Sequence, residues 1–213
     1  MEQKYQQILI KVAALYSRYG IRSVTMDDVA HELGISKKTL YQYVKDKNDL
    51  VEHVMEYIDQ SRVKMFILNR PPRMNAIEEL FFVNRKVHQI IKESNIVMDH
   101  DLQKYHPDIF EKGMKLKRER MYKNILENLI KGKKEGLYRA DLNEEIIAKT
   151  YLLRMSSVQT EEIISIHEFT SQIFINELYL YHIRGVASKK GLEFLENNKD
   201  RLFNPERENS KNQ

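Results

Sequence analysis

Apolar side chains recur every three or four positions along most of this chain, which is the spacing of an amphipathic α-helix. In the first such segment Ile8, Val12, Leu15 and Tyr19 keep this spacing up to Gly20. No segment alternates apolar and polar residues with period two over more than a few positions, so the pattern predicts an all-α fold. Helices are expected over about residues 3–19, 47–68, 74–93, 97–105, 108–132, 143–158, 169–183 and 188–198.

Two short helices near the N-terminus complete this pattern and bring the expected total to about nine to ten. Thr25 followed by Asp28 is a typical helix start, because the hydroxyl accepts from a free backbone N–H and the acid favours the positive helix end. Gly34 can adopt the left-handed backbone that ends this helix, and Ser36 can cap a second helix over about residues 37–43. Two short helices joined by a glycine-containing turn indicate a helix-turn-helix.

The second helix of this pair has an unusual outer face. Leu40 is its inward residue, and its other side chains are polar-ended without any Asp or Glu. From Lys37 to Lys47 the chain has four Lys and one Asp, a net charge of +3. Lys can neutralise phosphates, while Thr, Gln and Tyr can hydrogen-bond base edges or phosphate oxygens. A solvated surface helix is the alternative, but the turn and the caps favour a helix that enters a DNA groove.

The same stretch resembles the TetR/AcrR family of bacterial transcriptional regulators. The matching residues are Leu15-Tyr16, Gly20, Thr25, Val29-Ala30, Gly34-Ile35-Ser36, Thr39-Leu40-Tyr41, Tyr43-Val44, Lys47 and Leu50. The chain departs from the family pattern at Lys11-Val12, Lys38 and Val44. The departure at Lys38 bears on which operator sequence is read.

This resemblance implies two domains and a set of DNA contacts. A helix-turn-helix DNA-binding domain would occupy residues 1–48, and a helical ligand-binding and dimerisation domain would occupy residues 49–203. Residues 204–213 are expected to be a disordered tail. The resemblance implies that Thr25 and Lys47 contact the DNA backbone. The full set of predicted DNA-binding residues is Thr25, Ser36, Lys37, Lys38, Thr39, Tyr41, Gln42, Tyr43 and Lys47.

Composition excludes several other kinds of protein. Apolar residues make up 42% of the chain, and the absence of Cys excludes disulfides, thiolate metal sites and a Cys nucleophile. No run approaches the ~20 apolar residues of a membrane span, and the first residues lack the form of a signal peptide. We therefore expect a cytoplasmic protein with no membrane partner. Because the net charge is only +4, the DNA prediction depends on where the Lys residues lie.

Methionine and aromatic residues suggest an effector pocket in the larger domain. The nine Met, twelve Tyr and eight Phe could line an adaptable apolar pocket, although such residues at helical spacing more often form ordinary core. The family resemblance implies that this domain holds a small-molecule effector. The predicted pocket residues are Phe66, Phe81, His88, Met98, Phe110, Met114, Met121 and Tyr151. His88 could instead be a hydrogen-bonded core residue.

The segment at 169–183 has apolar residues on more than one side, which is too many for a helix with one wet face. We interpret the excess as a contact between two copies of the chain. A fully internal helix in a monomer is the alternative. The predicted homodimer interface contains Ile146, Leu153, Phe174, Leu178 and Tyr181.

Other chemistry has little support in the sequence. Asp99, His100, Asp101 and His106 are metal-ligand types, but ligands so close on one short helix rarely converge, so no metal or other cofactor is expected. The basic face at 112–123 could be a second nucleic-acid site, although such a face is more often a solvated surface. No Gly-rich phosphate loop, Gly-x-Ser-x-Gly or His-Glu-x-x-His motif is present, so no enzyme activity is predicted.

The sequence therefore predicts a homodimeric regulator of transcription that binds double-stranded DNA. Its simplest form is a repressor released from a palindromic operator by a small apolar or amphipathic effector. The helix at about 47–68, roughly 30 Å long, would act as a lever between the two domains. The alternatives are a constitutive DNA-binding protein of the same fold with no effector, and a helical interaction adaptor.

Overall fold

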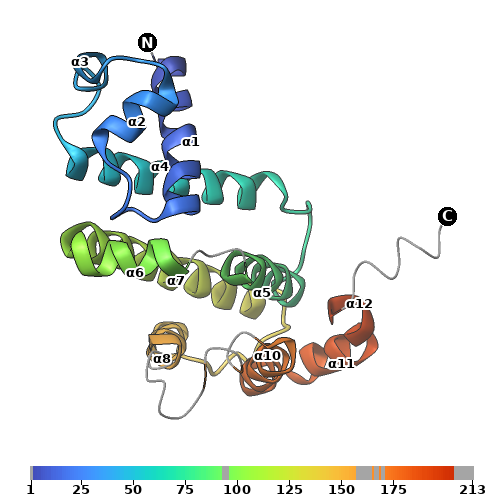
Figure 1. Ribbon diagram of the computed structural model, residues 1–213. Coiled ribbons are helices and arrows are strands. Elements are labelled where there is room, and N and C mark those ends of the chain that lie inside the picture. The colour runs from blue at the N-terminus through green and yellow to red at the C-terminus, as the bar shows by residue number, and fades with distance from the viewer. Residues whose placement is uncertain (1, 93–95, 157–164, 166–167, 169–170, 204–213) are drawn as a thin grey trace. The chain divides into compact units, whose positions relative to one another are not determined.

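The computed structural model describes residues 2–92, 96–156, 165, 168 and 171–203. Within these residues it contains eleven helices and no strand (Figure 1), which confirms the predicted all-α fold. The chain forms two compact units. The first unit is Met1–Asn69 with Ser94–Lys117, and the second is Arg70–Glu93 with Arg118–Gln213. The predicted tail at 204–213 lies outside the described residues.

The first unit carries the helix-turn-helix. Its helices are α1 (Glu2–Tyr19), α2 (Met26–Leu33), α3 (Lys37–Leu40), α4 (Lys47–Leu68), α6 (Ile96–Tyr105) and the first part of α7 (Pro107–Lys134). The helices α1, α2 and α3, here called the head, gather around the first turns of α4 (Figure 1). Helix α3 is shorter than predicted because its end is tightened. The Gln42 N–H donates to the Thr39 carbonyl at 3.2 Å, three residues back rather than four.

One hydrophobic core holds the first unit together. Val12 of α1, Val29 of α2, Leu40 of α3 and Val51 of α4 are almost completely buried in it. Met98 of α6 belongs to the same core, so the head has no separate core of its own. The expected boundary at residue 48 therefore separates the part proposed to bind DNA from the rest of the chain by function, not by packing. This functional boundary stays a prediction.

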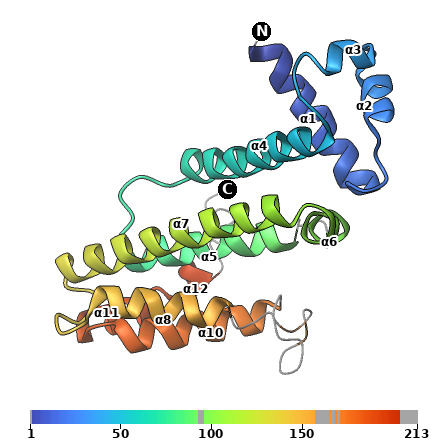
Figure 2. The ribbon, with the colours of Figure 1, turned by 90° about the vertical axis from the view of Figure 1, so that its left-hand side faces the viewer.

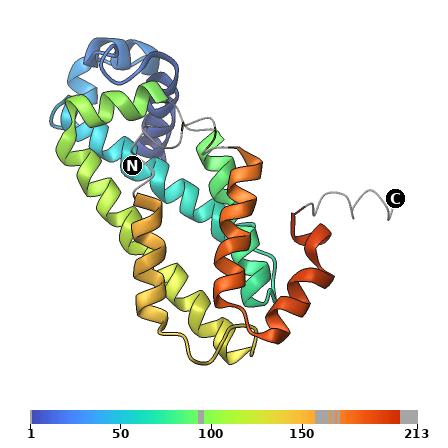
Figure 3. The ribbon, with the colours of Figure 1, turned by 90° about the horizontal axis from the view of Figure 1, so that it is seen from below.

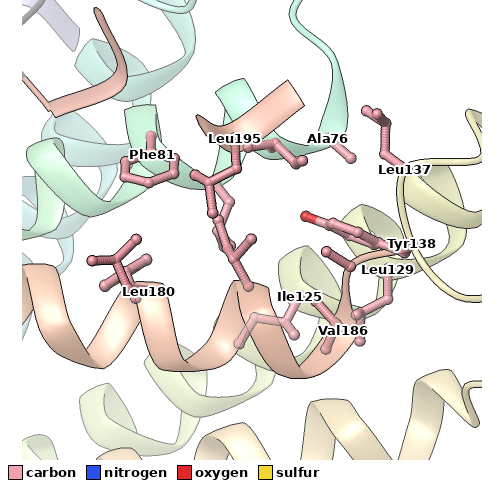
Figure 4. Packing of buried hydrophobic residues seen from close by; sticks show 14 of the residues in the cluster. Ala76, Phe81, Ile125, Leu129, Leu137, Tyr138, Leu180, Val186 and Leu195 are labelled. Carbon is pink, nitrogen blue, oxygen red and sulfur yellow. The ribbon is translucent and has the colours of Figure 1, made fainter. Parts of the chain in front are cut away.

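The second unit packs around its own core, shown in Figure 4. Its helices are α5 (Ala76–Lys92), the remainder of α7, α8 (Glu144–Ser156), α10 (Gln172–Val186), α11 (Lys189–Asn197) and α12 (Lys199–Phe203). Helix α12 was not expected from the sequence. Its Phe203 ring packs edge-on against Phe81, with ring centroids 4.8 Å apart, and so closes one side of the core. None of the described helices is long and apolar enough to cross a membrane.

A short extended link between α7 and α8 is bound to the turn between α10 and α11. The Arg139 N–H donates to the Val186 carbonyl, and the Ser188 N–H donates to the Leu137 carbonyl, each at 2.9 Å. The hydroxyl of buried Tyr138 donates to Asn128 Oδ1 at 3.0 Å. These bonds satisfy polar groups that would otherwise destabilise the core.

Glycine is required where α11 crosses this link. A Cβ on Gly191 would lie 2.0 Å from the Leu137 carbonyl oxygen, a backbone atom that cannot move aside. We expect Gly191→Ala to lower the free energy of unfolding by about 2–3 kcal/mol, because overpacking forces a backbone shift. Urea denaturation measures this. Gly185→Ala on α10 is the control, because a Cβ there meets nothing within 4 Å and alanine favours a helix. Equal stabilities of the two variants would contradict the close packing of α11 on the Leu137 carbonyl.

Candidate nucleic-acid interface

The start of α2 is fixed by reciprocal hydrogen bonds. Thr25 Oγ1 accepts from the Asp28 N–H at 3.2 Å, and Asp28 Oδ2 accepts from the Thr25 N–H at 2.8 Å. The hydrogen bonds from Thr25 lower the pKa of the Asp28 carboxyl. Gly34 ends α2 in the left-handed region, with φ +64°, and the Ile35 N–H then donates back to the Ala30 carbonyl. The predicted capping and turn are confirmed, and they set the angle at which α3 leaves α2.

The start of α3 is built by two hydroxyls. Ser36 Oγ accepts from the Thr39 N–H at 3.0 Å and lies 2.8 Å from Thr39 Oγ1. These two side chains therefore hold the helix start, and their role in DNA binding stays a prediction. Leu40 is completely buried, as predicted. On the outside of α3 and of the turn that follows it, the exposed side chains are those of Lys37, Lys38, Tyr41 and Gln42.

Lys37 has an acidic partner that the sequence analysis missed. Its Nζ lies 2.9 Å from Asp27 Oδ2, although both side chains remain well exposed. The hydrogen bond and the charge of Asp27 raise the pKa of Lys37. The acid-free face of α3 is thus partly neutralised by α2, and a DNA phosphate would compete with Asp27 for this ammonium.

Removing this competition should strengthen DNA binding. We expect Asp27→Asn to raise affinity for duplex DNA about two- to fivefold at low salt, because it removes a negative charge and frees Lys37. Fluorescence anisotropy with a labelled duplex measures this. Asp141→Asn is a matched control, since Asp141 is similarly exposed and also has a basic neighbour, Arg139 at 3.8 Å. An equal rise in both variants, or in neither, would contradict a role for Asp27 at the interface.

Tyr43 is held by packing rather than directed outward. Its ring stacks on Tyr5 of α1, with centroids 5.7 Å apart and the planes 5° from parallel. The Tyr5 hydroxyl lies 2.6 Å from His53 Nδ1 of α4. Tyr43 therefore joins the end of α3 to α1, and Tyr5 extends this connection to α4. A contact between Tyr43 and a DNA base remains a prediction.

Lys47 lies at the start of α4, where Asp46 caps the helix by accepting from the Asp49 N–H at 2.8 Å. The Lys47 ammonium donates to the Arg22 carbonyl at 3.2 Å, in the turn between α1 and α2. Partial burial lowers the pKa of Lys47, and the charges of Asp101 and Asp28 oppose that shift. An ammonium beside the free N–H groups of a helix start suits a phosphate.

A cavity of about 100 Å³ lies within the first unit, between α4, α6 and the first part of α7. Its apolar wall includes Met55, Met98, Phe110 and Met114, and Lys112 lies on its charged rim. Lys112 Nζ bridges Glu52 at 2.5 Å and Glu56 at 2.9 Å, both on α4. As it stands, the cavity would hold only a small group, since drug-sized ligands usually occupy ~300–1,000 Å³.

The predicted pocket residues are divided between the two units. Met98, Phe110 and Met114 line the cavity together. Phe66 lies on α4 but not in the cavity wall. The rest belong to the second unit, where Phe81 and Tyr151 are core residues and Met121 packs against that core. His88 is also buried there. A ligand site around these last four residues stays a prediction.

The candidate metal ligands have other roles. Asp101 Oδ2 accepts from the Arg22 N–H at 2.9 Å, and His106 Nδ1 lies 2.6 Å from Asn48 Oδ1. Among the described residues, no group of three or more His, Asp or Glu side chains is placed to hold a metal ion.

The predicted dimer residues lie on α8 and α10, which are neighbours in the second unit (Figure 2). The Tyr151 ring of α8 packs against His182 of α10, with centroids 4.9 Å apart. Leu153 and Tyr181 are 70% and 75% exposed, and Ile146 is 58% exposed. Phe174 and Leu178 are half-buried, and Ile173, which the prediction omitted, is 79% exposed. In the single chain these two helices thus present large apolar side chains to solvent.

Comparison with known proteins agrees with this geometry. Residues 8–54, which contain the helix-turn-helix, match the family described as bacterial regulatory proteins, tetR family. The uncharacterized HTH-type transcriptional regulator YvaF of Bacillus subtilis is 27% identical over 167 residues, covering 78% of this chain and 86% of that protein. The uncharacterized regulator Rv0472c of Mycobacterium tuberculosis is 35% identical over 77 residues, but these cover only 31% of its length.

Solved structures share the fold over most of the chain. The TetR-family transcriptional regulator SCO4454 from Streptomyces coelicolor superposes with a TM-score of 0.65 at 15% identity, covering 88% of this chain and 98% of that one. A gamma-butyrolactone receptor, an ArpA-like protein, superposes with a TM-score of 0.57 at 14% identity, covering 94% of this chain and 96% of that one. At these identities the likeness concerns the fold alone.

Proposed function

We propose, because the chain belongs to the TetR family of bacterial transcriptional regulators, that it is a cytoplasmic repressor which binds a palindromic operator as a homodimer. A small apolar or amphipathic effector would release it. The observation that carries DNA binding is the outer face of α3, where Lys37, Lys38, Tyr41 and Gln42 are exposed beside capped and rigid helix starts. Such side chains suit phosphates and base edges in a major groove.

A two-fold dimer would present two copies of α3 to one side of a duplex. Half-sites one helical turn apart require recognition helices about 34–36 Å apart. The exposed apolar residues of α8 and α10 support such a dimer, since one face can pair with its own copy around a two-fold axis. The palindrome of the operator would then mirror the symmetry of the protein.

The cavity beside α4 supports an effector. A ligand that binds better to a shape with the heads at another spacing would shift the population away from the DNA-bound state. The gamma-butyrolactone receptor is, by its name, a receptor for a small molecule, so a ligand is compatible with this fold. The small size of the cavity, about 100 Å³, favours the second candidate, a constitutive DNA-binding protein of the same fold with no effector.

A gel shift with the DNA that flanks the protein's own coding region tests DNA binding. A retarded band that is lost when cell extract or a metabolite library is added supports the effector-released repressor. A band that no addition removes, with no ligand raising the melting temperature, supports the constitutive protein, because a ligand of the native state must stabilise it. No band at low salt would contradict DNA binding and leave the helical adaptor.

A further inference from the structure

The turn between α1 and α2, residues 20–24, is bound by a helix from outside the head. Asp101 of α6 is only 8% exposed, and its Oδ2 accepts from the Arg22 N–H at 2.9 Å. The two residues are 79 positions apart in sequence. A carboxylate that accepts a backbone N–H away from water forms a stronger bond than a neutral acceptor does. Figure 3 shows α6, in light green, lying across the blue head.

Gly20 of this turn lies close to the Asp101 carboxylate. Gly20 has φ +81°, and a Cβ there would lie 2.8 Å from Asp101 Oδ2. Gly34 has a similar φ of +64°, yet a Cβ there would meet nothing within 4 Å. A side chain at position 20 would therefore displace the Asp101 carboxylate from the turn, in addition to the strain of the positive φ.

Arg22 makes two further contacts that extend this attachment. Its guanidinium donates to the Tyr105 hydroxyl at 2.8 Å and lies over the Tyr105 ring, 5.0 Å from the centroid. Its carbonyl accepts from the Lys47 ammonium at 3.2 Å. Three residues after Arg22 the capping residue Thr25 begins α2. One short turn thus connects α6 to both residues expected to contact the DNA backbone.

The same helix also forms part of the cavity wall. Met98 and Leu102 of α6 line the cavity, while Asp101, between them in sequence, binds the turn. Met98 and Asp101 are three residues apart, and Asp101 and Leu102 are adjacent, so the cavity wall and the bond to the turn lie within about one turn of α6. A group that fills the cavity and displaces this part of α6 would therefore also displace Asp101 and, through it, the turn of the head.

We propose that Asp101 is a positioning residue for DNA binding, which sets the α1–α2 turn so that Thr25 and Lys47 meet the DNA backbone. Through Asp101, α6 connects the cavity to the head. This inference rests on the proposed DNA-binding function. Asp101 is buried against the turn, so it would act through the turn rather than by touching DNA.

The test compares three full-length variants. Asp101→Ala removes the acceptor, Asp101→Asn keeps an oxygen acceptor without the charge, and Glu111→Ala removes one charge from an exposed position on α7 outside the cavity wall. Anisotropy with a duplex from the flanking DNA gives affinity, and hydrogen–deuterium exchange of the free protein gives the protection of the Arg22 amide. We expect Asp101→Ala to bind about tenfold more weakly and to show faster Arg22 exchange. Asp101→Asn should recover most of the affinity and of the Arg22 protection, and Glu111→Ala should match the unaltered protein.

Two results would overturn the proposal. One is wild-type affinity in folded, dimeric Asp101→Ala, and the other is a loss of affinity without any change at the Arg22 amide. If Asp101→Ala does not fold, Tyr105→Phe replaces it, because Tyr105 is exposed and only its hydroxyl is lost. That variant should bind two- to threefold more weakly, and unchanged binding would again overturn the proposal. If the unaltered protein binds no DNA, the proposed function fails, whereas Arg22 exchange still reports whether Asp101 holds the turn.

Discussion

Replacing both Leu153 and Tyr181 with glutamate is expected to convert the proposed dimer to monomers and to lower operator affinity by about a hundredfold or more. Both side chains are at least 70% exposed in the single chain, on neighbouring helices α8 and α10. A dimer would bury them, and burying an uncompensated carboxylate is costly. The affinity falls because a monomer binds one half-site and loses the high effective concentration of the second head.

Analytical ultracentrifugation and anisotropy measure the two effects separately. Leu68→Glu is the control, because it introduces the same carboxylate at a similarly exposed apolar position, 72% exposed, on α4 of the first unit. That variant should remain dimeric and bind DNA normally. A persistent dimer in the double variant would show that the interface lies elsewhere.

The second large effect is expected at α3. Lys37→Ala combined with Tyr41→Ala should weaken operator binding at least a hundredfold, since each base or phosphate contact contributes ~1–3 kcal/mol and a dimer loses each contact twice. Tyr41 is 44% exposed and Leu40 beside it is fully buried, so the outer face can change while the core stays intact. Dimerisation and melting temperature should therefore be unchanged.

A matched control for this variant lies on α1 of the same head. Lys11 and Tyr19 are exposed residues of the same two types, and Tyr19 is 51% exposed. Lys11→Ala combined with Tyr19→Ala removes the same groups from a surface not proposed to enter the groove, and its affinity should stay within about threefold of the unaltered protein. Equal losses in the two double variants would remove the special role of α3.

Local structure in the head could be predicted because its causes are local. Thr25 and Asp28, like Ser36 and Thr39, are three residues apart, so a cap and its partner can be recognised in a short stretch of sequence. Gly34 likewise ends α2 by its own backbone freedom. These features and Leu40 were enough to predict the helix-turn-helix.

The contacts that could not be predicted join residues far apart in sequence. The pair of Lys37 with Asp27 depends on the angle between α2 and α3, and the bond from Arg22 to Asp101 depends on where α6 packs. Neither angle nor packing follows from a periodic pattern. The effector site shows the same limit, because a buried Met or Phe has the same sequence pattern in a cavity wall and in a core. Met98 and Phe110 line the cavity, whereas Phe81 fills the core of the second unit.

The most direct test of the claim that α3 enters a DNA groove is a hydroxyl-radical footprint on the DNA that flanks the coding region. We expect two protected patches whose centres lie about one helical turn, ~10 base pairs, apart on one face of the duplex. Both patches should disappear together in the Lys37→Ala, Tyr41→Ala variant. A single protected patch, or an unchanged footprint in that variant, would contradict the claim that paired α3 helices read the operator.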